Sequence, residues 1–320
     1  MAGAWRRPNF NAESKGVIPI SHFTVMVIGP DVEGQLRPYD EEIQVAPYRK
    51  YDDPAWLFRF YATEQPEQPE PTLEELIAWI NERWEDEGEK YGIDELGVYT
   101  LSTYSQNSKW DWYTVGGRWR GFFKLKQLAM DRATEARLGE PGVFGNDPVY
   151  DADEVLRGDV DAEAMRAASG EAAGERWDRA HKLFKGTSEP DAWEVFLERY
   201  PDDVEAARAE YAVQPRIEAV RKHDDLCRKE DRWEDALLGL FGKIETYAVS
   251  REEYVQRARD NAICPYAYLK DGEWFAPGEM GWFGMSSDTD EEQIRFAREF
   301  NAMFDALPDD TPLAMVDAHI

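Results

Sequence analysis

The feature that most constrains the fold is a long stretch of helical composition, residues 128–232, which separates two segments in which strand and helix patterns alternate. Ala, Glu and Arg dominate this stretch, and its apolar residues recur at helical spacing. The clearest helical runs cover 162–168, 172–184, 193–200 and 204–211. Glycine and proline at 141–148 and 186–190 mark loops within it. We therefore predict an α-helical insertion.

The segment before the insertion begins with a β-branched, apolar run at 18–29 (IPISHFTVMVIG), which predicts a buried strand. Thr72 and Glu75 match a capping box in front of a helix that we expect to end near Glu89. Two further runs, 97–104 and 119–125, have strand composition. We expect a polar turn at 105–117 to join them.

The segment after the insertion repeats this alternation. Ser250 to Glu253 form another capping box, which predicts a helix that ends near Asn261. Asp271-Gly272 predicts a hairpin between strands at 266–270 and 273–275. A helix at 290–307 and an apolar strand at 313–320 complete the chain. We expect the first and last strands to pair in one sheet.

Together these patterns predict an α+β fold. Two βαβ-like halves would form a mostly antiparallel sheet with helices on one face, interrupted by the helical insertion. We expect a disordered tail at 1–16, a first α+β half at 17–127, the α-helical insertion at 128–232 and a second α+β half at 233–320.

Charge and composition exclude several classes of function. With 65 Asp and Glu against 37 Lys and Arg, the net charge is −28, which opposes non-specific binding to nucleic acid or to an anionic membrane. We find neither an apolar run of a membrane helix's length nor a secretory signal. Two cysteines are too few for a disulfide framework or a zinc site. We expect a cytoplasmic protein that needs neither a metal nor a cofactor.

A basic, aromatic string at 109–124 (KWDWYTVGGRWRGFFK) contrasts with this acidic background. Indole and phenol faces stack on flat rings, arginine forks bind phosphate, and glycines let backbone amides approach an oxyanion. The string predicts a site for a small anionic, nucleotide-like ligand, formed by Trp110, Trp112, Tyr113, Gly116, Gly117, Arg118, Trp119 and Arg120. Alternatively, the aromatics belong to the core of a hairpin and the arginines pair with acidic neighbours. A second glycine-aromatic loop, 277–284, would either face the first across a cleft or form a compact surface loop.

His22 and Thr24 fit the His-hydrophobic-Thr-hydrophobic signature of the two-histidine phosphoesterases, in which paired histidines act as acid and base. His319 would meet His22 if the first and last strands are neighbours, and Asp317 lies on the same face two residues earlier. These four residues are the candidate catalytic set of a metal-independent phosphodiesterase or nucleotide hydrolase. The alternative is that they are hydrogen-bonded structural residues.

Several blocks of the chain resemble an uncharacterised protein family of bacteriophages infecting actinobacteria. They are SHFTVMVIG, SKWDWYTVGGRWRGFF, SREEYVQRARDNA, KDGEWFAPGEMGWFG and DDTPLAMVDAHI. The resemblance implies a phage protein acting in the host cytoplasm and brings no catalytic residues with it.

Three functions are compatible with these observations, and whether the chain is an enzyme stays open. The first is an accessory protein that binds the nucleotide-like ligand to counteract a host defence. The second is the hydrolase that uses His22 and His319. The third is an acidic protein that mimics nucleic acid and binds a host protein.

Overall fold

A computed structural model describes residues 22–84, 90–131, 136–142, 145–238, 243–279 and 287–320. The tail expected at 1–16 and most of the loop 277–284 lie outside these ranges. The chain divides into two compact units. The large unit comprises Met1–Pro30 and Thr114–Asp317, and the small unit comprises Asp31–Tyr113 and Ala318–Ile320.

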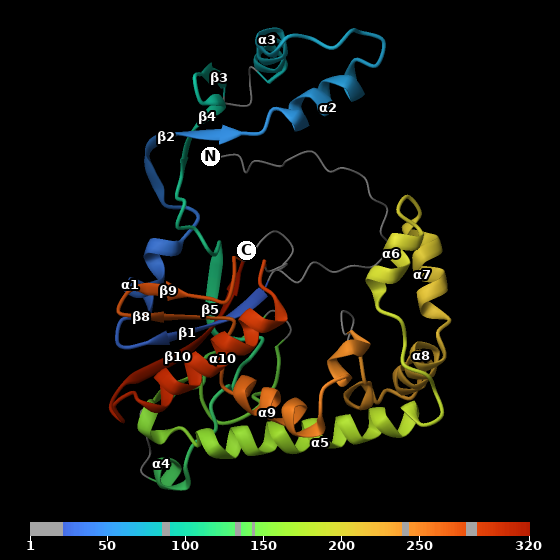
Figure 1. The fold of residues 1–320 in the computed structure, drawn as a ribbon. Helices are drawn as coiled ribbons and strands as arrows, with labels where there is room; N and C mark the ends of the chain where they lie inside the picture. Colours follow the sequence, from blue (N-terminus) through green and yellow to red (C-terminus); the bar gives the residue numbers. More distant parts are fainter. Residues whose placement is uncertain (1–21, 85–89, 132–135, 143–144, 239–242, 280–286) are drawn as a thin grey trace. The chain divides into compact units, whose positions relative to one another are not determined.

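The large unit is built on a seven-stranded mixed sheet with the order β6-β5-β10-β1-β8-β9, and β7 also pairs with β10 (Figure 1). Its strands are β1 (His22–Ile28), β5 (Trp112–Gly117), β6 (Glu140–Pro141), β7 (Glu154–Leu156), β8 (Ala267–Lys270), β9 (Glu273–Phe275) and β10 (Pro312–His319). β1 runs parallel to β8, and β8 runs antiparallel to β9. The predicted pairing of the first and last strands is confirmed, because β1 and β10 are neighbours.

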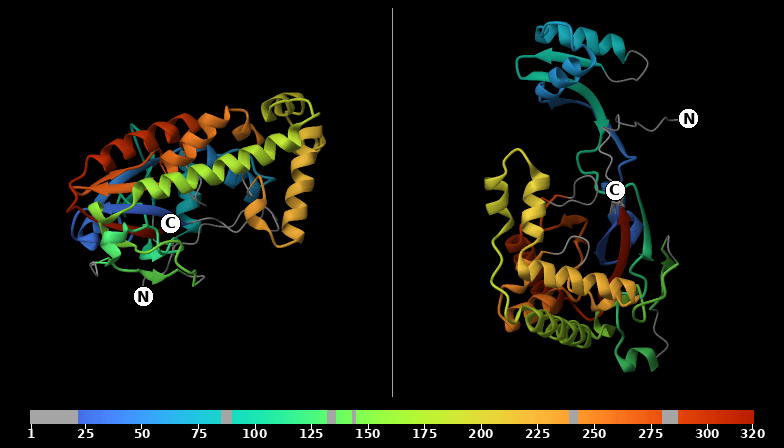
Figure 2. Two further views of the ribbon diagram at one scale, coloured as in Figure 1. Left: turned by 90° about the horizontal axis from the view of Figure 1, so that it is seen from below. Right: turned by 90° about the vertical axis from the view of Figure 1, so that its right-hand side faces the viewer.

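The helices of the large unit are mostly those of the predicted insertion and of the second half. They are α4 (Gln127–Asp131), α5 (Ala162–Phe184), α6 (Trp193–Arg199), α7 (Val204–Ala212), α8 (Pro215–Lys229), α9 (Arg251–Asn261) and α10 (Asp290–Asp305). Three 3₁₀ turns, at Arg157–Asp159, Trp233–Asp235 and Ile244–Tyr247, connect them. α10, α9 and α5 lie in succession on one side of the sheet (Figure 2). Within the described ranges, none of the helices has the length and apolar character of a membrane span.

Alternation along β1 and β10 explains how α10 packs on the sheet. Met26 and Met315 point to the same face and are fully buried against Phe300 and Phe304 of α10. His22 and Asp317 follow on this face by the same period of two. The core face of the sheet therefore ends in a polar pair.

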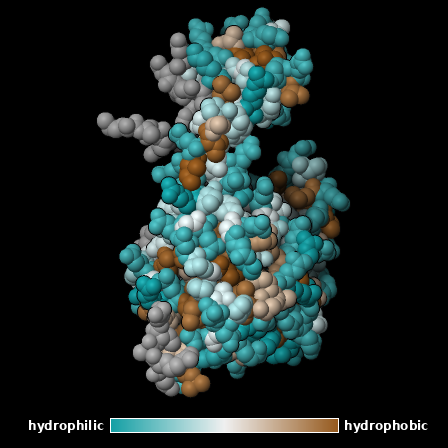
Figure 3. All heavy atoms as spheres, turned by 90° about the vertical axis from the view of Figure 1, so that its left-hand side faces the viewer, coloured by the Kyte–Doolittle hydropathy of each residue, from teal (hydrophilic) through white to brown (hydrophobic). Residues whose placement is uncertain are grey.

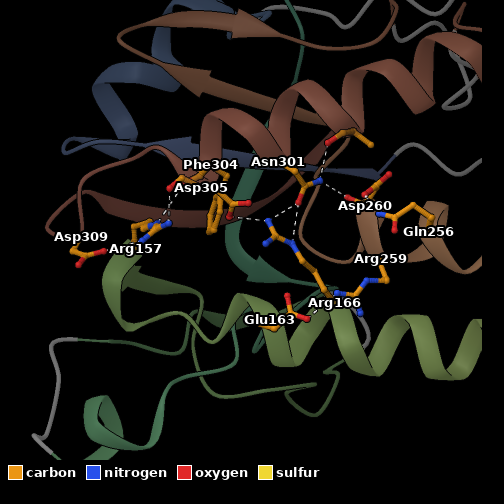
Figure 4. Close-up of polar contacts among 11 residues, drawn as sticks. Arg157, Glu163, Arg166, Gln256, Arg259, Asp260, Asn301, Phe304, Asp305 and Asp309 are labelled. Carbon is orange, nitrogen blue, oxygen red and sulfur yellow. Dashed lines mark hydrogen bonds and ion pairs between the residues drawn. The ribbon is translucent and has the colours of Figure 1, made fainter.

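A polar network connects helices α5, α9 and α10 to one another (Figure 4). Arg166 of α5 donates through two nitrogens to the side-chain oxygen of Asn301 on α10, at 3.1 and 2.7 Å. Asn301 in turn donates to the carbonyl of Asp260 on α9 at 2.6 Å. One amide side chain therefore links three helices.

The small unit contains a three-stranded antiparallel sheet with the order β2-β4-β3. The strands are β2 (Gln44–Asp52), β3 (Tyr91–Asp94) and β4 (Gly97–Tyr104), and the helices are α1 (Val32–Leu36), α2 (Ala55–Glu64) and α3 (Leu73–Arg83), with a 3₁₀ turn at Arg37–Tyr39. The predicted capping box starts α3, because the Thr72 and Glu75 side chains each accept the other's backbone amide. The core of this unit lies between the helices and the sheet and includes the buried side chains of Leu57, Leu76 and Val98.

The α+β class is confirmed, while two local predictions were wrong. The segment 112–117, expected to be a turn, forms β5, and 119–125 makes only single bridges at Phe123 and Leu125. The chain turns after β5, where the backbone amides of Arg118, Gly121 and Phe122 donate to buried carboxylates, described below. The helical runs 162–168 and 172–184 are one helix, α5, since Gly170 continues the helix where it packs closely on Arg259.

Candidate functional site

Each of the two predicted catalytic histidines has its own carboxylate partner. In the large unit, Nδ1 of His22 lies 2.7 Å from Oδ1 of Asp317. In the small unit, Nδ1 of His319 lies 2.7 Å from Oδ1 of Asp111. The predicted catalytic set is thus divided, with His22, Thr24 and Asp317 in one unit and His319 in the other.

The His22–Asp317 pair is buried. The side chains of His22 and Asp317 are 6 % and 0 % exposed, and Oδ2 of Asp317 accepts the backbone amide of Arg118 at 2.9 Å. Thr24 accepts the backbone amide of Tyr266 at 2.9 Å, which ties β1 to the start of β8. These hydrogen bonds join strands and a turn, as expected of groups that stabilise the fold.

A second buried carboxylate, Asp153, organises the same turn. It accepts the backbone amides of Gly121, Phe122 and Gly139, each at 3.0 Å, and it is fully buried. Backbone amides that surround an oxyanion are what the glycine-rich string predicted. In the structure, such amides donate hydrogen bonds to the carboxylates of Asp153 and Asp317, so the oxyanions come from the chain itself.

Gly116 and Gly117 allow these carboxylates to approach. Their φ angles are +76° and +55°, a conformation that side chains rarely adopt. A Cβ atom on Gly116 would lie 2.4 Å from Oδ2 of Asp153, and one on Gly117 would lie 2.3 Å from Cβ of Asp317. Both glycines are therefore required by close packing against the chain's own acidic side chains.

The other predicted ligand residues of the large unit lie at the turn itself. Trp119 is half-buried, and its backbone amide closes the turn onto the carbonyl of Gly116 at 3.0 Å. Nε of the half-buried Arg120 donates to the carbonyl of Gly139 at 3.1 Å. Arg118 is also half-buried, and its carbonyl accepts the side-chain amide of Asn146.

The predicted ligand residues of the small unit have two different environments. Trp110 is buried, donates from Nε1 to the carbonyl of Leu36 at 3.2 Å and meets the ring of Tyr113 edge-on. Trp112 instead stacks on the imidazole of His319, with ring centroids 5.2 Å apart and planes 14° apart. Residues predicted for two separate sites, Trp112 and His319, therefore belong to one cluster.

Backbone hydrogen bonds hold this cluster together. The amide of Asp111 donates to the carbonyl of His319 at 3.0 Å, and the amide of Glu41 donates to the carbonyl of Trp110 at 2.9 Å. The side chains of His319 and Asp111 are 25 % and 29 % exposed, so solvent reaches both. We name Glu41, Tyr104, Asp111, Trp112 and His319 the His319 cluster.

Two members of the His319 cluster have perturbed acidity. Burial, with the neighbouring carboxylates of Asp111, Asp40 and Glu42, raises the pKa of Glu41, and His319 partly opposes this. Burial, with the carboxylates of Glu41 and Asp111, also raises the pKa of Tyr104. Perturbed groups that solvent still reaches are typical of functional sites. Sequence reasoning missed both residues, since only the acidic run at 40–42 hinted at Glu41.

Within the described ranges, no group of three or more His, Cys, Asp or Glu side chains is placed to hold a metal ion. An open groove of about 430 Å³ lies between α9 and α10 in the large unit. It is lined by Ile294 and by six charged residues, Glu253, Arg257, Glu291, Arg295, Arg298 and Glu299. None of the predicted site residues lines this groove.

No protein-family model, curated protein or solved structure matches the chain.

Proposed function

We propose that the chain is a hydrolase of a nucleotide-like phosphodiester, with His319 as its catalytic base. The proposal depends on the imidazole of His319, which is accessible to solvent and whose Nδ1 lies 2.7 Å from Oδ1 of Asp111. Beside it lies the carboxyl group of Glu41, whose pKa is raised. An imidazole oriented by a carboxylate and a neighbouring carboxyl group whose pKa is raised together supply a base and an acid for general acid–base catalysis.

The roles follow from the contacts. Asp111 accepts the Nδ1 proton of His319, which leaves Nε2 as the basic nitrogen. Trp112, stacked on the ring, limits its rotation. Nε2 removes a proton from a water whose oxygen attacks phosphorus, while Glu41 donates its proton to the leaving oxygen as the P–O bond breaks. The products are a phosphomonoester and an alcohol, and solvent returns the proton from His319 to Glu41.

Charge favours a diester over a monoester as the substrate. Asp40, Glu42 and Asp111 surround Glu41, and two unit charges about 4 Å apart interact by about 4 kcal/mol at an effective dielectric constant near 20. A phosphomonoester dianion would meet about twice the repulsion of a diester monoanion.

Ligand binding without turnover is the second candidate function. It is favoured by the flat Trp112–His319 stack, whose ring planes lie 14° apart. In this case the chain would be a phage accessory protein that sequesters a nucleotide-like signal in the host cytoplasm.

The test is to incubate the purified chain with linear and cyclic dinucleotides, mononucleotides and bis(p-nitrophenyl) phosphate, and to separate the products by ion exchange. The hydrolase proposal predicts diester cleavage that falls by about 10²-fold or more in His319→Gln. The matched control is His181→Gln on α5, whose imidazole stacks on Trp177 and is outside the cluster. Its activity should equal that of the wild type.

The outcomes separate the two candidates. Diester cleavage that survives His319→Gln would exclude the proposed catalytic role. A nucleotide that is depleted but recovered intact after denaturation would favour binding without turnover. An unchanged panel would contradict both.

A further inference from the structure

The sheet of the small unit is covered by helices on one face. Val98 of β4 packs against Leu57 of α2 and Leu76 of α3 on that face. Because side chains alternate along a strand, Tyr99 and Leu101 point to the opposite face. The register places Tyr51 beside Tyr99 and Arg49 beside Leu101 on β2. We name Arg49, Tyr51, Tyr99 and Leu101 the open sheet face.

The open sheet face exposes apolar surface. Leu101 is 57 % exposed and Tyr51 is 40 % exposed. Apolar side chains also reach the surface elsewhere on this unit, among hydrophilic ones (the upper part of Figure 3). Tyrosine and arginine are enriched among the residues that contribute most to binding at protein interfaces, and exposed apolar surface is typical of interaction sites.

The side chains of this face are held in place by one another. The guanidinium carbon of Arg49 lies 4.6 Å from the ring centre of Tyr99, and Tyr51 meets Tyr99 edge-on at 5.9 Å. Asp94 of β3 accepts hydrogen bonds from both Arg49 and Tyr51. These side chains would therefore lose little conformational entropy when a partner binds.

The net charge of the small unit indicates which kind of partner the open sheet face would bind. Residues 31–113 contain 20 Asp and Glu against 7 Lys and Arg, a net charge of −13. A second copy of the chain would be repelled, and so would nucleic acid, whereas a basic partner would be attracted. An extended segment presents every second side chain to one side, which matches the spacing of residues along β2 and β4.

We propose that the open sheet face docks an extended protein segment in which basic and apolar residues alternate. The apolar side chains contact Tyr51, Tyr99 and Leu101. The basic side chains alternate with them and point away from the sheet, and the net negative charge of the small unit attracts them at longer range. This docking is independent of the chemistry at His319.

Two synthetic octapeptides with equal charge test the proposal on the full chain. One alternates lysine with leucine and the other alternates lysine with glycine, so that their difference in affinity isolates the apolar contact. Fluorescence anisotropy should show the leucine peptide binding at least about tenfold more tightly, which corresponds to about 1.4 kcal/mol. Higher salt should weaken both complexes.

The variant Leu101→Ser should reduce this difference about three- to tenfold, because it removes an exposed side chain without adding charge. The matched control is Val213→Ser, at a site in the large unit that is 68 % exposed. It should leave the difference in affinity between the two peptides unchanged. Circular dichroism would establish that both variants fold. Equal binding of the two peptides, or a difference that persists in Leu101→Ser, would overturn the proposal. A dimer of the wild type that Leu101→Ser dissolves would assign the face to a second copy instead.

Discussion

The two histidine–carboxylate pairs have the same contact and different surroundings. In both, Nδ1 of the imidazole lies 2.7 Å from a carboxylate oxygen. The pair in the large unit, His22 and Asp317, is almost completely buried, and its carboxylate also binds a backbone amide. The pair in the small unit, His319 and Asp111, is about one quarter exposed. Burial therefore distinguishes two otherwise equal pairs, because solvent and solutes reach only the accessible one.

Removing the carboxylate from each pair should give the largest contrast in stability. Asp317→Ala leaves a buried imidazole and the amide of Arg118 without their acceptor, and we expect it to lower the free energy of unfolding by about 3–5 kcal/mol. Asp111→Ala breaks a solvent-screened pair and should cost about 1 kcal/mol or less. Urea denaturation of both variants measures the difference. Equal losses would mean that burial does not distinguish the pairs.

Close packing around the buried pair should give the next largest effect. Gly117→Ala combines a left-handed backbone with a methyl group 2.3 Å from Cβ of Asp317, and we expect it to cost more than about 2 kcal/mol. Gly145→Ala is the matched control, because its φ is +59° but, among the described residues other than its chain neighbours, no atom lies within 4 Å of the added methyl. It should lose only the backbone component of about 1–2 kcal/mol. Similar Tm shifts in the two variants would show that the contact with Asp317 relaxes without cost.

The smallest effect concerns Glu41 and depends on pH. Because burial and the carboxylates of Asp111, Asp40 and Glu42 raise the pKa of Glu41, the folded chain binds its proton more tightly than the unfolded chain does. The resulting penalty is absent below the ordinary pKa of glutamate and complete above the raised one. Glu41→Gln should therefore stabilise the chain at pH 8, by less than about 1 kcal/mol after solvent screening.

This gain should disappear near pH 3.5, where the carboxyl is protonated in both states. Thermal unfolding of the wild type and of Glu41→Gln at the two pH values measures it. A gain that does not change with pH would assign the effect to packing rather than to charge.

Local signals in the sequence were reliable where they act within a few residues. Thr72 starts α3 through its predicted capping box, and Ser250 accepts the amide of Glu253 at the start of α9. Asp271 and Gly272 both have positive φ and turn β8 into β9, as the predicted hairpin requires. Each signal satisfies its own backbone groups, so no distant part of the chain is needed.

The turn after β5 could not be predicted in the same way. Its amides bond to Asp153 and Asp317, which follow Gly121 and Arg118 in the chain by 32 and 199 residues. The aromatic and arginine content of this segment is equally compatible with a ligand site. Only the fold shows that two carboxylates of the chain itself lie there.

The sequence by itself determined the α+β class, most helix starts and the presence of His319 and Trp112 as candidate functional residues, because these depend on residue type and local periodicity. Only the tertiary structure decided which side chains these residues contact. It joined His319 to Asp111 across 208 residues, stacked it on Trp112 and placed Glu41 beside them. It also buried His22 while leaving His319 accessible to solvent. The physical reason is that burial and the energy of a hydrogen bond between distant residues depend on how the whole chain packs, which local sequence patterns do not encode.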